Sequence, residues 1–215
     1  MAWNYSVQIN SLAGFDGNIT TASEEGENYN TLATQWLTDA AKEVINILPS
    51  DLLKLCTSVS SFTSAAVGSE AETLNTGKIL SVFAGNYQAR QISNSLKHKA
   101  NDSNSLQYAT STDPIFYIEA NKINVLPASL SCKYEEVQYP SVSYNATSIS
   151  SFPDEAEHLV VLRAAITAAE YKLNIEEDVE LYGPIIATLK AQYNEAINGL
   201  KTKNITPPRA SKEEG

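Results

Sequence analysis

The chain has 215 residues and a formal net charge of -10, from 25 acidic and 15 basic side chains. That length accommodates one good-sized domain, or a smaller one with an inserted module, and its core needs no disulfides. The acidic balance argues against a protein that grips nucleic acid, because affinity for phosphate comes chiefly from Lys and Arg. It is compatible with a protein that lies beside DNA without sticking to it.

Cysteine and hydropathy patterns argue against two further classes. Cys56 and Cys132 are the only cysteines, and we expect two buried thiols rather than a disulfide. The N-terminus has no signal-peptide pattern, and no apolar segment reaches the roughly 20 residues that span a bilayer. We therefore expect neither secretion nor membrane association.

Residues 1–30 are acidic and contain no Lys or Arg, which predicts an extended N-terminal arm. Tyr5, Val7 and Ile9 alternate with polar residues. This alternation leaves two hypotheses open: the arm adds a short strand to a neighbouring subunit, or it is a frayed tail.

A helix is predicted at residues 32–48, where apolar side chains such as Leu37, Val44 and Leu48 recur at the three-and-four spacing of one helix face. It ends at Pro49, whose ring cannot continue the hydrogen-bond ladder. Residues 31–56 thus supply the first part of a helical bundle.

Residues 57–143 change to short runs rich in Ile, Val, Tyr and Phe, separated by Gly, Asn, Asp and Pro. This pattern predicts an inserted antiparallel β module. Its clearest hairpin is DPIFYIEANKINVLP, in which Ala120 and Asn121 form the turn and Pro114 and Pro127 bound the two strands.

Residues 144–200 complete the bundle with two more helices. The first, at residues 151–173, is predicted to have Ser151 as its N-cap, Asp154 as the capping-box partner, and Pro153 inside the first turn.

The last predicted helix covers residues 176–200, where Gly183 and Pro184 allow a kink. Residues 201–215 are proline-containing and predict an extended C-terminal tail. The whole chain is therefore predicted to be α+β: a bundle of one N-terminal and two C-terminal helices, an inserted antiparallel β module, and extended termini.

The head of the helix at residues 151–173 contains Glu155 and His158 at the Glu-x-x-His spacing of di-metal bundles. Such bundles use the motif twice, whereas it occurs once here, and carboxylates in a first helical turn are already favoured by the helix dipole. No nucleophile motif or phosphate loop accompanies it. We expect no metal, no cofactor and no catalysis.

Four basic residues without acidic neighbours in sequence form a mildly basic stripe in the β module: Lys78, Arg90, Lys97 and Lys99. The stripe is either a dock for an acidic partner surface or a solvated sheet face, and the second hypothesis is the simpler one.

The same helix at residues 151–173 is apolar over most of its circumference, so it must be covered on most sides. Its polar residues Arg163 and Glu170 lie on one narrow stripe, and alanines such as Ala164 and Ala168 permit close helix approach. Two hypotheses follow. Either these four residues form a seam between subunits, or the helix is wrapped by its own chain.

SLQYATSTDPIFYIEANKINVLP, followed by YPSVSYNATSISSFPDEAEHLVVLRAAITAAEYKL, resembles virion structural proteins of tailed bacteriophages, notably of marine and cyanobacterial phages. In those proteins a helix similar to TQWLTDAAKEVINILP precedes a β region, and an apolar helix headed by FPDE follows it. The resemblance covers roughly residues 31–200 and rests on packing and turn patterns.

The architecture is similar to that of adaptor, or head-completion, proteins of the phage neck. The resemblance implies a homo-oligomeric ring, usually of about twelve copies, between the portal protein and the tail or a second neck protein. It implies that DNA passes through the lumen without specific binding. It also implies assembly in the host cytoplasm and a final location in the virion.

The family resemblance further implies that the C-terminal segment binds the portal, which here involves Lys201, Lys203, Pro207, Pro208, Arg209 and Lys212. The long acidic arm and the large β module depart from minimal adaptors. An alternative is therefore a tail or capsid-surface virion protein whose β module binds a carbohydrate or a receptor. A closed ring that binds the portal would distinguish the two.

Overall fold

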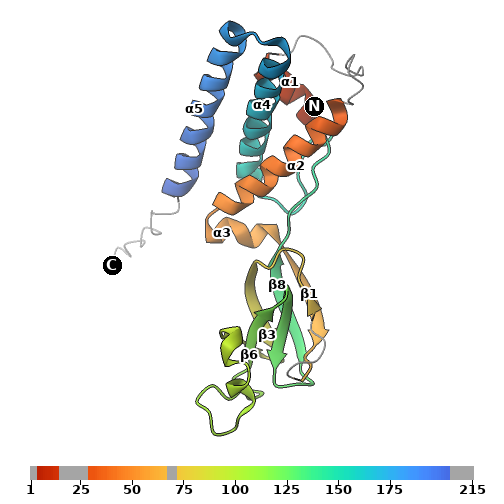
Figure 1. Cartoon of the computed structure of the whole chain (residues 1–215), viewed down its shortest axis with the longest axis vertical. Helices are drawn as coiled ribbons and strands as arrows, with labels where there is room; N and C mark the ends of the chain where they lie inside the picture. Colours follow the sequence, from red (N-terminus) through yellow and green to blue (C-terminus); the bar gives the residue numbers. More distant parts are fainter. Residues whose placement is uncertain (1–3, 15–28, 67–71, 204–215) are drawn as a thin grey trace, which may run out of the picture. The chain divides into compact units, whose positions relative to one another are not determined.

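The computed structural model describes residues 4–14, 29–66 and 72–203 and confirms the α+β class (Figure 1). The chain forms two compact units. The helical unit comprises the described residues up to Leu55 and from Tyr139 onward, and the β unit is Cys56–Gln138. The β unit ends earlier than the predicted 57–143, because the segment after Gln138 packs on the helical unit.

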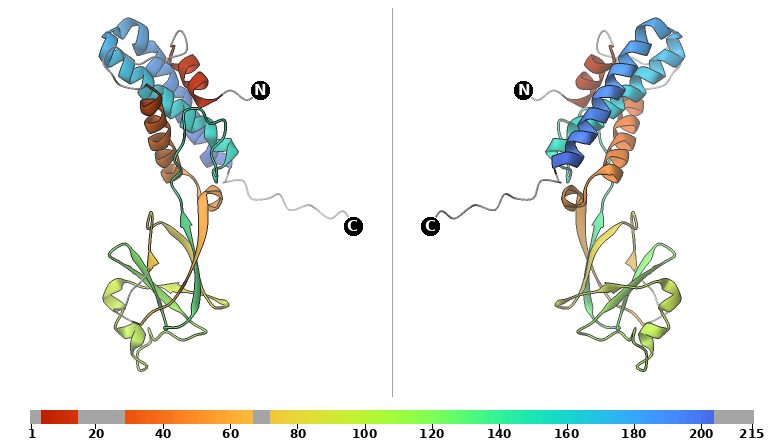
Figure 2. Two further views of the ribbon diagram at one scale, coloured as in Figure 1. Left: turned by 90° about the vertical axis from the view of Figure 1, so that its right-hand side faces the viewer. Right: turned by 90° about the vertical axis from the view of Figure 1, so that its left-hand side faces the viewer.

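The helical unit contains α1 (Tyr5–Ala13), α2 (Tyr29–Ile47), the single turn α3 (Ser50–Leu53), α4 (Asp154–Glu176) and α5 (Val179–Lys203). The long helices run side by side, and α4 contacts α1, α2 and α5 (Figure 2). Nine residues of α4 are buried: Ala156, Leu159, Val160, Val161, Ala164, Ala165, Ile166, Ala168 and Ala169. The helix is apolar nearly all round because other helices of its own chain surround it.

Helix α1 corrects the prediction of an extended arm. Asn4 caps it, since its side-chain oxygen accepts a hydrogen bond from the Val7 N–H at 3.0 Å. Gly14 ends it in the left-handed conformation that favours glycine. Tyr5, Ile9 and Ala13 are buried, so the buried residues recur every four positions, as on one face of a helix. Residues 1–3 and 15–28 of the predicted arm lie outside the described residues.

Helix α2 holds the segment that returns from the β unit. The hydroxyl of Thr38 accepts a hydrogen bond from the Val142 N–H at 3.1 Å, and that of Thr34 accepts one from the Tyr144 N–H at 3.3 Å. The helix ends before Pro49, as predicted. These contacts are why residues 139–143, expected in the β module, belong to the helical unit.

The start of α4 differs from its predicted capping box. Pro153 is the N-cap, its side chain makes no cap hydrogen bond, and Ser151 adopts a positive φ of 53° two residues earlier. Glu157 supplies a different connection: it accepts hydrogen bonds from the Ile149 N–H at 2.6 Å and from the Tyr5 hydroxyl at 3.1 Å. It therefore links α4 to α1 and to the preceding segment.

Helix α5 begins at Val179, continues through Pro184 and extends to Lys203, three residues beyond its predicted end. Lys201 and Lys203, expected in an extended tail, thus belong to its last turn. Pro207, Pro208, Arg209 and Lys212 lie outside the described residues.

The β unit contains two four-stranded sheets, with strand orders β1-β8-β3-β4 and β2-β7-β6-β5. The strands are β1 (Thr57–Thr63), β2 (Glu72–Thr73), β3 (Ile79–Ala84), β4 (Tyr87–Gln88), β5 (Arg90–Gln91), β6 (Ile115–Glu119), β7 (Lys122–Leu126) and β8 (Ser131–Val137). Among the described residues of this unit, every strand pair is antiparallel except β5 and β6. That parallel pair corrects the prediction of a wholly antiparallel module.

The predicted hairpin is confirmed as β6 and β7. Ala120 and Asn121 connect these strands with positive φ angles of 48° and 59°. Val125, Phe116 and Tyr134 lie in the apolar core cluster that joins residues of both sheets. Cys56 and Cys132 are buried and form no disulfide, and burial raises the pKa of Cys56 to about 11.

A buried carboxylate organises the turn before β3. Glu136 is 1% exposed, and its Oε1 accepts hydrogen bonds from the Thr76 N–H at 2.6 Å and the Gly77 N–H at 2.9 Å. Gly77 has a φ of 72°, which glycine adopts without strain. Burial alone would raise the pKa of Glu136, but the backbone donors outweigh it and lower the pKa.

Candidate functional site

The structure places Ala164 and Ala168 inside the chain's own core. Both are 0% exposed, between α4 and the helices packed on it. They cannot form a seam with another subunit, because no surface of theirs remains to be covered. The hypothesis that α4 is wrapped by its own chain is therefore correct for these two positions.

The polar stripe of α4 lines a charged groove formed by α2, α4 and α5, with a volume of about 310 Å³. Arg163 Nε donates to Glu43 Oε2 on α2 at 2.7 Å, and the Tyr193 hydroxyl on α5 donates to Glu43 Oε1 at 3.3 Å. Burial lowers the pKa of Arg163, but Glu43 more than compensates and raises it. Burial and the charge of Glu43 raise the pKa of Tyr193 to about 12.

Glu170, the second charged residue of the stripe, pairs with Lys190 of α5 at 2.8 Å. The two candidate interface charges thus meet opposite charges on α2 and α5 of the same chain. Asn194 and Ile166 complete the groove. Each cation in the groove pairs with an anion, and these ion pairs connect the three helices. The groove therefore has no net charge with which to select an ion.

We expect the Arg163 and Glu43 pair to stabilise the helical unit modestly, because both side chains are partly exposed. A double-mutant cycle with Arg163→Ala and Glu43→Ala should give a coupling free energy of about 0.5–1 kcal/mol in chemical denaturation. The more exposed pair Lys54 and Asp51 is the control, and its coupling should be near zero. Equal coupling free energies in the two cycles would contradict a stabilising role for the Arg163 and Glu43 pair.

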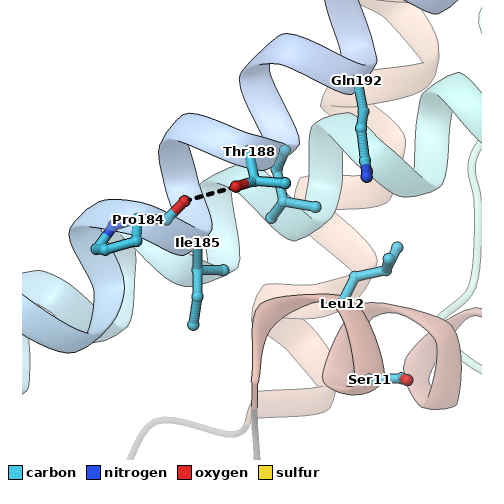
Figure 3. A pocket seen from close by; sticks show the side chains of 7 residues that line it. Ser11, Leu12, Pro184, Ile185, Thr188 and Gln192 are labelled. Carbon is cyan, nitrogen blue, oxygen red and sulfur yellow. Dashed lines mark hydrogen bonds between the residues drawn. The ribbon is translucent and has the colours of Figure 1, made fainter.

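A second groove, apolar and about 340 Å³ in volume, lies between α1 and α5 (Figure 3). The side chains of Leu12 on α1 and Gln192 on α5 point toward each other, and Ile185 of α5 also lines the groove (Figure 3). The Thr188 hydroxyl on its rim donates to the Pro184 carbonyl at 2.9 Å. Because Leu12 is 36% exposed, this groove is an apolar surface of the helical unit that the chain leaves partly open.

Gly14 fixes the approach of α1 to α5 at this groove. A Cβ at its position would lie 3.1 Å from Ile185 Cδ1, and its φ of 73° is strained for any other residue. Glycine therefore meets two requirements here: it ends α1, and it allows the end of that helix to pack closely on α5.

At the head of α4, Glu155 and His158 are exposed. Within residues 4–14, 29–66 and 72–203, no group of three or more His, Cys, Asp or Glu side chains is arranged to hold a metal ion. A pocket beside this helix start is lined by Leu55, Phe152 and Asp154 among others.

In the same described ranges, no helix has the length and apolar character of a membrane span.

Two of the four residues of the predicted basic stripe, Arg90 and Lys97, form ion pairs within the β unit. Lys97 donates to both carboxylate oxygens of Glu119, at 2.7 and 2.9 Å, and this contact lowers the pKa of Glu119. Arg90 pairs with Asp113 at 3.2 Å and donates to Gln107 at 2.7 Å. The acidic partners come from the region around the β6–β7 hairpin, which the stripe's own sequence window did not include.

Neither a protein-family model nor a curated protein matches this sequence.

Sequence reasoning missed Glu43, Glu157 and Lys190, each of which connects two helices. Their partners on the other helices, Arg163, Tyr5 and Glu170, are 20 or more residues away in sequence, so no local spacing signals these contacts. The apolar groove was missed because it depends on α1, whose start and stop signals, Asn4 and Gly14, were present but unused.

Proposed function

We propose that this protein is a structural subunit of the phage neck, an adaptor that forms a ring between the portal and the tail and passes DNA. The observation that carries the proposal is the architecture. A helical unit is interrupted by an inserted β unit and is completed by a long last helix that leads to the C-terminal segment. This is the arrangement expected from the resemblance of residues 31–200 to connector proteins.

The composition supports the proposal independently of the resemblance. A net charge of -10 suits the wall of a channel through which a polyanion must slide. The C-terminal segment after α5 has mixed charge instead, with two prolines, Arg209 and Lys212 ahead of Glu213 and Glu214. A short segment with prolines, mixed charge and little apolar content does not fold alone and suits ordering on a partner's surface.

The ring contact must use surface other than Ala164 and Ala168. In a closed ring, one face of each subunit meets a different face of the next. The groove between α1 and α5 offers the required apolar surface on the helical unit, with Leu12 and Ile185 on its two walls. This groove replaces the alanines as our candidate for one side of the seam, and a helix of the neighbouring copy is its proposed occupant.

The test removes the C-terminal segment. A chain truncated after Lys203 keeps all of α5, so we expect a folded protein with unchanged helical circular dichroism. Mixed with heads that carry the portal, the full chain should co-sediment as a closed ring and the truncated chain should not. Electron microscopy of the heads and native mass spectrometry of the released neck measure both outcomes.

A matched control keeps the length and removes the two positive charges, by changing Arg209 and Lys212 to Ser. It should reduce recruitment less than truncation does, since the prolines remain. Recruitment of the truncated chain equal to that of the full chain would contradict portal binding by this segment. A full chain that never forms a ring, with or without portal, would overturn the proposed function itself.

A further inference from the structure

Strand β1 forms an open edge of its sheet. In the order β1-β8-β3-β4 it is outermost, and its seven residues pair with β8 along their whole length. The opposite edge is the two-residue β4. Among the described residues, β1 is therefore the long strand of this sheet with a free side.

The register shows which backbone groups face outward. The Gln138 N–H donates to the Cys56 carbonyl at 2.8 Å, and the Ser64 N–H donates to the Leu130 carbonyl at 2.9 Å. In an antiparallel pair such hydrogen-bonded positions alternate, so the even-numbered residues of β1 bond to β8. The N–H and C=O groups of Val59, Ser61 and Thr63 consequently point away from the sheet.

This edge lacks the devices that normally protect one. Proteins block free strand edges with charged side chains, proline or bulges, because unpaired backbone groups are a template for another strand. Residues 55–69 contain no charged residue and no proline, in a chain that is otherwise strongly acidic. The pairing of β1 with β8 is continuous, without a bulge. Val59 is 63% exposed beside this edge.

We propose that β1 pairs with β1 of a second copy, in an antiparallel arrangement centred on Ser61. In this register Ser61 faces Ser61 of the partner, and Val59 faces Thr63. Every outward N–H and C=O of these three residues then has a partner, because the outward positions of one strand coincide with those of the other.

The side chains fit the same register. Val59 opposite Thr63 is a pair of β-branched residues, a favourable cross-strand combination, and no like charges meet. A second copy is favoured over a charged partner segment because the uncharged edge offers nothing to bind a charge. It also lets two chains of net charge -10 pair through strands that carry no carboxylate themselves, while on β8 Glu135 beside Val59 is balanced by Lys133 beside Ser61.

This pairing goes beyond the proposed function and does not depend on it. A two-fold contact joins the same surface of both copies, whereas neighbours in a closed ring join two different surfaces. The pairing therefore links copies that are not neighbours in one ring. The contact is short, so we expect a weak dimer that depends on protein concentration.

A cysteine at the centre of the pair tests the register in the full chain. Directly opposed residues at hydrogen-bonded positions lie about 5.5 Å apart between Cα atoms, within the range that a disulfide bridges. Ser61→Cys should form a disulfide-linked dimer under mild oxidation at high concentration. The native Cys56 and Cys132 are buried and should not contribute.

Lys133→Cys is the matched control. Lys133 is exposed on β8 directly beside Ser61, and in the proposed pair it lies three strand spacings, about 14 Å, from its counterpart. It should not crosslink. A dimer yield for Ser61→Cys no higher than that for Lys133→Cys would overturn the proposal.

Opposite charges provide a second test that is independent of oxidation. Ser61→Lys and Ser61→Glu each place like charges face to face, so each variant alone should be monomeric in sedimentation at concentrations where the parent dimerises. An equal mixture, with one variant tagged, should restore a mixed dimer. Both variants should melt like the parent, since the Ser61 side chain is exposed. A folded Ser61→Lys that dimerises like the parent would also refute the pairing.

Discussion

Ala168→Glu is expected to unfold the helical unit rather than to weaken an interface. Ala168 is completely buried on α4, where an added side chain overpacks the core and brings an unpaired charge with it. We expect a loss of about 3–5 kcal/mol, comparable to the whole stability of many domains. Circular dichroism at 222 nm should fall, and hydrogen exchange should show α4 unprotected in the full chain.

Ala187→Glu is the control for this experiment. Ala187 lies on α5 and is exposed, so the same substitution there should change stability by no more than about 0.5 kcal/mol. If Ala168→Glu instead folded normally and only failed to assemble, Ala168 would have to lie at a subunit contact, and the packing of α4 within its own chain would be wrong.

The second large effect is expected at Glu136. Glu136→Ala removes the buried acceptor of the Thr76 and Gly77 N–H groups, which lie at a half-buried turn. The loss of two charge-assisted hydrogen bonds is costly, and we expect a loss on the order of 3 kcal/mol in the β unit. Hydrogen exchange at residues 75–77 and across β8 should report this loss while α4 and α5 remain protected.

The same carboxylate makes the stability of the β unit depend on pH. The pKa of Glu136 is lower in the folded chain than the ordinary value of about 4.3 for an unfolded chain. Because its pKa is lower in the folded chain, Glu136 binds fewer protons when the chain is folded. Its contribution to the free energy of unfolding is therefore complete at pH values above the pKa of the unfolded chain. That stabilisation is lost as pH falls through the folded pKa. Denaturation of the parent below pH 5 should show this loss.

Glu135→Ala is the matched control for both measurements at Glu136. Glu135 is the neighbouring residue on the opposite face of β8 and accepts a hydrogen bond from the Ser81 hydroxyl at 2.8 Å. It is less buried, so its removal should cost less than about 1 kcal/mol. Equal losses for Glu135→Ala and Glu136→Ala, or an unchanged acid profile in Glu136→Ala, would show that the turn does not depend on Glu136.

The elements that the sequence predicted well are those with strong local signals. The β6–β7 hairpin has Pro114 before it and Ala120 and Asn121 at its turn, and α2 has a clear apolar face that stops before Pro49. Helix α1 was missed because nine residues are too short for a periodicity to stand out. Tyr5 and Ile9 fit a strand alternation as well as a helix face, and the capping signals at Asn4 and Gly14, which favour the helix, were not used.

Candidate site residues were harder to predict than elements. The sequence singled out Arg163 and Glu170 correctly as a polar stripe on a buried helix, but it could not show that their partners are Glu43 and Lys190. It also could not decide what covers Ala168, because an alanine face packs equally well on its own chain or on another. That choice depends on contacts between α4 and α2, which are separated by the whole β unit in sequence.

The hydrogen bond between Cys56 and Gln138, where the chain enters and leaves the β unit, has a consequence for synthesis on the ribosome. The β unit is complete once Gln138 has emerged, whereas α2 must wait for α4. A β unit that folds first brings its two ends together and shortens the effective loop between α2 and α4 roughly fourfold. At about 0.6 kcal/mol for each halving, this lowers the entropic cost of closing the helical unit by about 1 kcal/mol. A β unit that folds first would thus assist the folding of the unit that it interrupts.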